Sequence, residues 1–259
     1  MPGFSSPQDR AREYLADART VLVLTGAGVS AESGVPTFRG DGGLWKSHRP
    51  EELATPAAFA RDPRLVWEWY GWRRGLVAGC APNAAHRALA RFAAGRSGVV
   101  LATQNVDGLH GRAADDETGV RGAPPPAPSA VLELHGSLFR VRCTLCPYAA
   151  AHDAPVDASD RATLPRCPMC GALLRPGVVW FGEPLEAPVL AAAMRAAERA
   201  DACLVVGTSG VVQPAASLAA ITREAGGRVI EVNPESTPLT ALADEVLRGA
   251  AGELLPQLL

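Results

Sequence analysis

Thr20-Val21-Leu22-Val23-Leu24-Thr25-Gly26-Ala27-Gly28-Val29-Ser30-Ala31 is a short apolar run that ends in a glycine-containing turn. Similar apolar runs recur at residues 98–103, 202–207 and 228–232. Each run is apolar on both faces, as expected of central parallel strands that helices cover. Helical patterns flank these runs, at residues 8–18, 83–94, 186–200 and 214–225. This alternation predicts an α/β fold with a doubly wound parallel sheet.

The turn after the first run has the pattern Gly26-x-Gly28-x-x-Ala31. Glycines let the backbone turn sharply and approach a diphosphate, which helix N-terminal N–H groups stabilise. A dehydrogenase would carry an acidic residue after a second strand about twenty residues later. Residues 34–40 instead form a Gly/Pro-rich loop that could fold over a ligand. Because such turns are common, the pattern alone leaves nucleotide binding open.

Two Cys-x-x-Cys pairs stand twenty residues apart: Cys143 and Cys146, then Cys167 and Cys170. This is the spacing of a Cys₄ zinc ribbon, in which each pair forms a knuckle. Four thiolates fill a tetrahedral shell, so one Zn²⁺ bound here would be structural. Disulfides or redox thiols are the alternative. Cys80 and Cys203 lie among small or apolar residues, which predicts buried, unreactive thiols.

Two segments interrupt the alternation of strands and helices. Residues 46–80 are aromatic and helical in pattern, and residues 141–176 hold the paired cysteines among short strands. We expect these insertions to form one small domain, beside a core domain of residues 1–45, 81–140 and 177–259. A third segment, residues 114–129, is rich in acidic residues and proline, which predicts an exposed, poorly ordered loop.

Composition narrows the classes of function. The chain has 259 residues, of which 47% are hydrophobic and 20% charged, as in an ordinary globular protein. Its net charge of −2 gives no electrostatic basis for binding nucleic acid. No apolar run is long enough to span a bilayer, and the N-terminus lacks a secretory-signal pattern. Cysteines in metal-ligand spacing favour a reducing compartment, so we expect a cytoplasmic location.

Polar residues follow the predicted strand 98–103: Gln104, Asn105 and Asp107. Ligands of open α/β sheets bind beyond the carboxyl ends of the strands, so Asn105 and Asp107 are placed to recognise a carboxamide. An Asx-turn that closes a loop is the structural alternative. Since histidine titrates near neutrality, His135 is a candidate general base. His110 competes with it, whereas we expect His86 to pack or cap a helix.

The order of these and later motifs resembles the sirtuin (Sir2) family over about residues 8–256. The motifs are Gly26-Ala27-Gly28-Val29-Ser30, Gly34-Val35-Pro36-Thr37-Phe38-Arg39, Thr103-Gln104-Asn105-Val106-Asp107, His135-Gly136, the two cysteine pairs, Val178-Val179-Trp180-Phe181-Gly182-Glu183, Gly207-Thr208-Ser209 and Val232-Asn233-Pro234-Glu235. Each motif is modest alone, but their joint order and spacing are specific.

The resemblance implies an NAD-dependent protein-lysine deacylase with a large Rossmann-like domain and a small domain made of a helical module and a zinc ribbon. NAD would lie in the cleft between the domains. Its expected contacts are Gly26, Ala27, Gly28, Ser30, Ala31, Thr37, Phe38, Arg39, Trp45, Gln104, Asn105, Asp107, Gly207, Thr208, Ser209, Asn233, Glu235 and Ala251. Within this set, Phe38 would shield the reactive C1′ of the nicotinamide ribose. Asn105 and Asp107 would line the nicotinamide pocket.

The family mechanism makes His135 and Asn105 the catalytic residues. The carbonyl oxygen of the acyl-lysine attacks C1′ as nicotinamide leaves. His135 then removes a proton from a ribose hydroxyl, which attacks the acyl carbon, and water releases lysine and O-acyl-ADP-ribose. A positioned general base of this kind contributes about 10²–10⁴-fold.

The resemblance also implies where the protein substrate binds. A peptide strand would lie between residues 178–183 and the loop 210–214, completing a small sheet through backbone hydrogen bonds. The expected contacts are Val178, Trp180, Phe181, Gly182 and Glu183. Because backbone contacts read little side-chain identity, we expect broad tolerance of protein sequence.

Tyr70 and Arg73 are three residues apart, which places them on one face of a helix. A phenol and a guanidinium together can hold a carboxylate, although an ordinary helix surface is the simpler interpretation of the bare sequence. The pair falls where the desuccinylase and demalonylase subgroup of sirtuins carries its Tyr-x-x-Arg. We therefore expect removal of succinyl, malonyl or glutaryl groups, with deacetylation alongside.

Three alternatives stay open. The first is a sirtuin deacetylase without a preference for acidic acyl groups. The second is a non-catalytic zinc-ribbon binding module whose nucleotide site only senses NAD, and the third is a mono-ADP-ribosyltransferase. The expected partners are proteins that carry acylated lysine. We expect a monomer that binds neither nucleic acid nor membrane.

Overall fold

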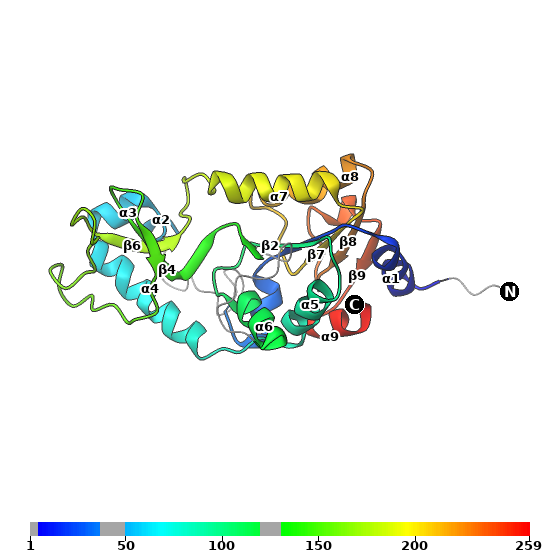
Figure 1. The fold of residues 1–259 in the computed structure, drawn as a ribbon, viewed down its shortest axis with the longest axis horizontal. Coiled ribbons are helices and arrows are strands. Elements are labelled where there is room, and N and C mark those ends of the chain that lie inside the picture. The colour runs from blue at the N-terminus through cyan, green and yellow to red at the C-terminus, as the bar shows by residue number, and fades with distance from the viewer. Residues whose placement is uncertain (1–4, 37–49, 120–130) are drawn as a thin grey trace.

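A computed structural model describes residues 5–36, 50–119 and 131–259 (Figure 1). In this part of the chain, two sheets lie towards opposite ends of the molecule. The larger is a six-stranded parallel sheet of order β3-β2-β1-β7-β8-β9, and the smaller is a three-stranded antiparallel sheet of order β5-β4-β6. The predicted α/β fold with a parallel sheet is confirmed.

The strands of the large sheet are β1 (Val21–Thr25), β2 (Val99–Thr103), β3 (Val131–Glu133), β7 (Ala202–Val206), β8 (Arg228–Val232) and β9 (Glu245–Leu247). Four of them match the apolar runs to within one residue. β3 and β9 are three-residue edge strands that no apolar run indicates. β1 lies centrally, and its last residue, Thr25, pairs with Thr103 of β2 and Val206 of β7. The segments that follow β1, β2 and β7 therefore leave the sheet at the same level.

Alternate residues of β1 serve two separate cores, because successive side chains of a strand point to opposite faces. Val21 and Val23 join a cluster with the helices on one face, whereas Leu22 and Leu24 join a cluster with those on the other. The first face carries α1 (Pro7–Asp17), α5 (Ala84–Ala94) and α9 (Ala251–Leu258), and the second carries α7 (Ala187–Arg199) and α8 (Ser217–Glu224). No helix in the described residues is long and apolar enough to cross a membrane.

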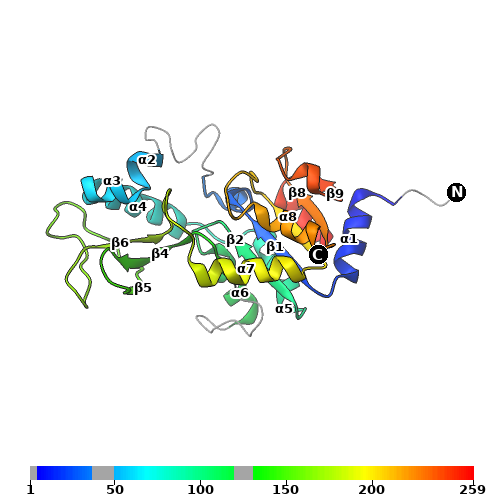
Figure 2. The same cartoon turned by 90° about the horizontal axis from the view of Figure 1, so that it is seen from above.

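A third core packs the small sheet against neighbouring helices. Figure 2 shows these helices beside the small sheet. Its elements are α2 (Pro50–Leu53), α3 (Pro56–Arg61), α4 (Pro63–Ala78), β4 (Gly136–Cys143), β5 (Ala149–Ala151) and β6 (Leu174–Val178). Trp67 of α4 is fully buried there, and its Nε1 donates to the carbonyl of Leu174 over 3.0 Å. Val106, just beyond β2, packs into this core and accepts a hydrogen bond from the N–H of Leu138. The small unit is thereby attached to the carboxyl edge of the large sheet.

Two local expectations need correction. The segment 114–129 was expected to be a loop, but α6 (Leu109–Thr118) covers its first residues, and residues 120–130 lie outside the described part. Leu109 and Ala113 are both fully buried, so an apolar i,i+4 pair packs the helix despite its acidic composition. Cys203 is buried as predicted, whereas Cys80 is half-buried.

The turn after β1 forms a short 3₁₀ helix, η1 (Ala27–Ser33), packed tightly against the end of β7. The N–H of Gly28 donates to the carbonyl of Gly207 over 2.8 Å. A Cβ on Gly28 would lie 2.7 Å from that oxygen, and a Cβ on Gly26 would lie 2.7 Å from Cα of Thr208. These glycines therefore have a packing role of their own, independent of any diphosphate.

We expect Gly28→Ala to lower the free energy of unfolding by about 1–3 kcal/mol, because backbone must move to admit the methyl group. Gly75→Ala is the matched control. Gly75 lies in α4 with nothing within 4 Å of an added Cβ, so this exchange should stabilise the helix slightly. Urea denaturation measures both. Equal stability of Gly28→Ala and wild type would contradict the packing role.

Candidate functional site

Asn105 connects the ends of β1 and β2. Its Nδ2 donates to the carbonyl of Gly26 and to Oγ of Ser30, each over 3.1 Å. Its backbone N–H donates to Oγ1 of Thr103 over 3.0 Å. Asn105 is buried, its side-chain amide makes two of these hydrogen bonds and its backbone makes the third, so the amide has a fixed orientation beside the glycine turn.

Asp107 lies beside the same turn and is 5% exposed. Its carboxylate accepts hydrogen bonds from Oγ of Ser30 at 2.8 Å and from the N–H of Leu109 at 2.9 Å. Burial raises the pKa of Asp107, and these hydrogen bonds oppose the rise. Since Ser30 donates its single proton to Asp107, it must accept from Asn105 and from Nε2 of His86, which lies 3.3 Å away.

His86 and His110 are both buried, with ring centroids 4.7 Å apart. His86 completes a capping box with Asn83 at the start of α5, which confirms the predicted packing and capping role. Burial lowers the pKa of His86 to about 4 and the pKa of His110 well below its ordinary value, so both rings are neutral at neutral pH. Nε2 of His110 is engaged by Oγ1 of Thr25 at 3.0 Å, which makes His110 a poor candidate base.

His135 lies between the two sheets, immediately before β4, and is half-buried. Its Nδ1 lies 3.0 Å from the carbonyl oxygen of Gln104. A carbonyl can only accept, so Nδ1 carries the hydrogen and Nε2 presents a lone pair. Burial lowers the pKa of His135, and the hydrogen bond to Gln104 partly opposes this. At neutral pH the ring is thus a neutral base with a fixed tautomer.

A second group of expected nucleotide contacts lies around the ends of β7 and β8. Nε2 of Gln104 donates to Oγ1 of Thr208 at 2.8 Å, and Nδ2 of Asn233 donates to the carbonyl of Thr208 at 2.9 Å. Thr208 is buried, whereas Ser209 and Glu235 are exposed. Strand ends far apart in sequence are thereby joined around one residue.

The remaining predicted nucleotide contacts divide into two groups. Ala27 and Ala31 belong to η1, and Ala251 begins α9, where the N–H of Gly252 donates to Oε2 of Glu32 over 2.6 Å. This bond joins η1 to the C-terminal helix. Four others lie outside the described residues: Thr37, Phe38, Arg39 and Trp45.

Tyr70 and Arg73 share the inner side of α4, and both are buried. Cζ of Arg73 lies 4.7 Å from the ring centroid of Trp69 and 5.7 Å from that of Tyr70. Burial raises the pKa of Tyr70 and lowers that of Arg73. The Asp107 carboxylate partly opposes the latter shift, so Arg73 lies within electrostatic reach of the residues that follow β2. Tyr70 and Arg73 therefore do not form an ordinary solvated helix surface.

The expected substrate-binding turn after β6 mostly turns its side chains inward. Val178 and Trp180 are buried in the third core. The carboxylate of Glu183 accepts from the guanidinium of Arg175. Phe181 is 54% exposed, and Gly182 has a φ of +83°. The exposed part of this turn is therefore Phe181 and Gly182.

Sequence reasoning missed several members of the buried network. Oγ1 of Thr25 donates to Oγ1 of Thr103 over 2.8 Å and also contacts Nε2 of His110, whose ring lies beside that of His86. Thr25 and Thr103 each end a predicted strand, and this repeated position is the signal that could have identified them. The contact of His86 with Ser30 joins residues 56 positions apart, which no local pattern indicates.

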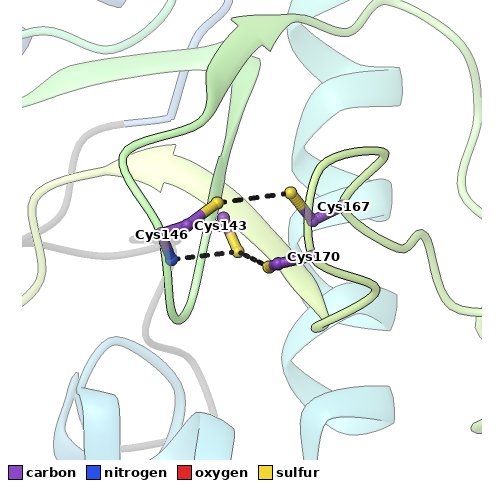
Figure 3. A group of neighbouring side chains, drawn as sticks. All are labelled: Cys143, Cys146, Cys167 and Cys170. Atoms are coloured by element: carbon purple, nitrogen blue, oxygen red, sulfur yellow. Dashed lines mark hydrogen bonds between the residues drawn. The ribbon is translucent and has the colours of Figure 1, made fainter.

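The four paired cysteines form one cluster (Figure 3). Their Sγ atoms all lie within 4.8 Å of one another, with Cys143 and Cys170 at 3.4 Å and Cys146 and Cys167 at 3.5 Å. A tetrahedral Zn²⁺ with Zn–S bonds of about 2.3 Å needs sulfurs about 3.8 Å apart. The residues therefore fit one structural zinc ion, which would join the end of β4 to the segment that precedes β6.

Comparisons with known proteins agree with the geometry. A model of the Sir2 family matches residues 26–214. The chain is 53% identical over 246 residues to NAD-dependent protein deacylase 1 of Archaeoglobus fulgidus, covering 94% of this chain and 93% of that protein. A solved complex of a Sir2 homologue mutant with ADP-ribose has a TM-score of 0.85 at 50% identity, covering 96% and 94% of the two chains. A Sir2 protein bound to a myristoylated histone peptide has a TM-score of 0.73 at 36% identity, covering 97% and 94%.

We expect the purified protein to contain one zinc ion per chain. Cys170→Ser should lose the metal and unfold at a lower temperature, because metal binding supplies folding free energy to a small cysteine-ligated unit. Cys80→Ser, which removes a thiol outside the cluster, is the control and should keep the metal. Elemental analysis and thermal unfolding measure the outcome. A metal-free wild type, or equal zinc in both variants, would refute the assignment.

Proposed function

This chain belongs to the Sir2 family, and from that premise we propose that it is an NAD-dependent protein-lysine deacylase. The observation that carries the proposal is that His135 is neutral and has a fixed tautomer. Its Nδ1 hydrogen is fixed by the carbonyl of Gln104, which leaves Nε2 as a neutral base beside the carboxyl edge of the sheet. A general base acts in its unprotonated form, and burial favours that form of His135 by lowering its pKa.

The residues around η1 fit a bound dinucleotide. Oγ of Ser33, in the turn proposed to hold the diphosphate, is buried and has no hydrogen-bond partner in the described part of the chain. Asn105 and Asp107 present an amide and a carboxylate of fixed orientation, suited to a carboxamide. When bound, NAD supplies an electrophilic ribose carbon and nicotinamide as the leaving group. We propose that Thr208 and Asn233 hold the adenosine half.

The protein's own part in the reaction is orientation and proton removal. We propose that Asn105, clamped by Gly26 and Ser30, fixes the nicotinamide end. His135 takes a proton at Nε2 while the Gln104 carbonyl stabilises the resulting imidazolium through Nδ1–H. The buried pair His86 and His110 stays neutral and adds no positive charge beneath the site.

We further propose that the acyl group ends in a carboxylate, as in succinyl-, malonyl- or glutaryl-lysine. Arg73 supplies a buried guanidinium and Tyr70 a buried hydroxyl on the same side of α4. Tyr70 accepts a hydrogen bond from Nε1 of Trp180 over 2.9 Å, so its own O–H hydrogen is available to a ligand. A carboxylate can accept a hydrogen bond from each of these groups. The relative bound to a myristoylated peptide carries a different acyl class, so a broader deacylase is the rival.

The partners and the location follow as proposals. A peptide strand bound along the backbone of residues 178–183 is supported by the exposed turn at Phe181 and Gly182. We propose that residues 46–80 and 141–176 act as one unit, supported by the core they share. The four-thiol cluster supports a reducing, cytoplasmic location. Monomeric state and lack of nucleic-acid binding stay predictions.

His135→Ala should lower kcat for deacylation of an acylated peptide by about 10²–10⁴-fold, while fold and zinc content persist. His152→Ala, a histidine of the small unit, is the matched control. In the wild type, kcat/KM should fall as the pH drops through the pKa of His135, which lies below the ordinary value of 6.5. Near wild-type turnover by His135→Ala would exclude it as the base.

Arg73→Met should lose activity on a succinyl peptide selectively. The ratio of kcat/KM on succinyl and acetyl forms of one peptide should fall by at least about tenfold, because charge-assisted hydrogen bonds contribute about 1.5–3 kcal/mol. Arg64→Met changes an exposed arginine of the same helix and should leave the ratio unchanged. Equal losses on both peptides from Arg73→Met would contradict the carboxylate-binding role.

A further inference from the structure

Trp180 belongs to the turn expected to contact substrate, yet its side chain is 2% exposed. Its indole N–H donates to the hydroxyl oxygen of Tyr70 over 2.9 Å. The ring of Phe59 packs beside it, with ring centroids 5.4 Å apart. A side chain this enclosed meets the protein rather than a peptide. Its one polar atom is committed to Tyr70.

Arg175 and Glu183 hold the indole in place. Nη1 and Nη2 of Arg175 donate to the two carboxylate oxygens of Glu183 over 2.6 and 2.8 Å, which is a bidentate ion pair. Cζ of Arg175 lies 3.4 Å from the ring centroid of Trp180, so the guanidinium stacks on the indole. Oε2 of Glu183 also accepts the backbone N–H of Trp180 at 2.8 Å. Backbone and ring of Trp180 are therefore fixed by one ion pair.

This ion pair is itself well anchored. Nη2 of Arg175 donates to the carbonyl of Val178 over 2.8 Å, and Arg142 approaches Glu183 at 3.4 Å. Burial alone would raise the pKa of Glu183, but the hydrogen bonds from Arg175 and Trp180 outweigh it and hold that pKa below its ordinary value. Glu183 thus stays ionised, and the guanidinium keeps its partner.

The hydrogen bond from Trp180 restricts the direction in which the Tyr70 hydroxyl can point its hydrogen. A phenol oxygen that accepts from the indole N–H must point its own hydrogen elsewhere. Arg73, on the same side of α4, has its guanidinium carbon 5.7 Å from the Tyr70 ring. A carboxylate that meets Arg73 is then offered the Tyr70 O–H as well. Without the indole donor, the phenol would be free to rotate its hydrogen away.

We propose that Trp180, fixed by the Arg175–Glu183 ion pair, is a positioning residue that sets the direction of the Tyr70 hydroxyl and so determines preference for acidic acyl groups. The part concerning acyl preference rests on the proposed function. Trp180 acts through Tyr70 and touches no substrate.

A double-mutant cycle tests this indirect action. Trp180→Phe keeps an aromatic ring over Arg175 but removes the N–H, and it should lower the succinyl-to-acetyl ratio of kcat/KM by about five- to tenfold. Tyr70→Phe should lower it by a similar factor. The double variant should fall no further than the lower single variant. Trp72→Phe, the same exchange at a side chain 51% exposed on α4, should leave the ratio unchanged.

Two outcomes would overturn the proposal: a wild-type ratio in Trp180→Phe, or a double variant whose loss is the product of the single losses.

A spectroscopic measurement tests the hydrogen bond without any activity. In ¹H–¹⁵N spectra, the indole resonance missing from Trp180→Phe should move upfield in Tyr70→Phe. If that resonance does not move, the positioning role is wrong whatever the acyl class. A wild-type enzyme with no succinyl preference would instead refute the proposed acyl class, while the resonance still decides the role of Trp180.

Discussion

Gly28 donates its N–H to the carbonyl of Gly207 over 2.8 Å, and neither Gly26 nor Gly28 has room for a Cβ against the end of β7. This contact holds the turn after β1 at the carboxyl edge of the sheet. There Asn105 reaches both the Gly26 carbonyl and Ser30, and Thr208 receives Gln104 and Asn233. A side chain on either glycine would separate the chain segments that carry the site.

Electrostatic differences then assign roles to residues of the same type. His86 and His110 are enclosed and hydrogen-bonded at Nε2, so they act as neutral structural groups. His135 is half-buried and bonded through Nδ1, so its Nε2 is free for proton transfer. Tyr70 and Arg73 place a buried hydroxyl and a buried guanidinium on one side of α4, where we propose that they bind an acyl carboxylate. Exposure and hydrogen-bond direction, rather than residue type, distinguish the proposed base His135 from the structural histidines His86 and His110.

Much of this organisation could be predicted from the sequence, because local patterns determine it. The central strands were placed to within one residue, and the cysteine spacing led to a real cluster of sulfurs. The inward side chains of Trp180 and Glu183 could not be predicted, since their partners Tyr70 and Arg175 come from a distant helix and a neighbouring strand. The short edge strands β3 and β9 also lacked a local signal, because three residues carry no period. The helix α6 is hard to predict because acidic and small residues dominate its sequence, and a single apolar i,i+4 pair, Leu109 and Ala113, indicates its buried side.

The central claim is that a nucleotide and an acyl-lysine meet between the carboxyl edge of the large sheet and α4. A crystal structure of the protein with ADP-ribose and a succinyl-lysine peptide tests it most directly. In that complex we expect the succinyl carboxylate within hydrogen-bond distance of the Tyr70 hydroxyl and the Arg73 guanidinium, with Nε2 of His135 facing the ribose. A carboxylate left in solvent, or a nucleotide bound away from residues 104–107, would contradict the account.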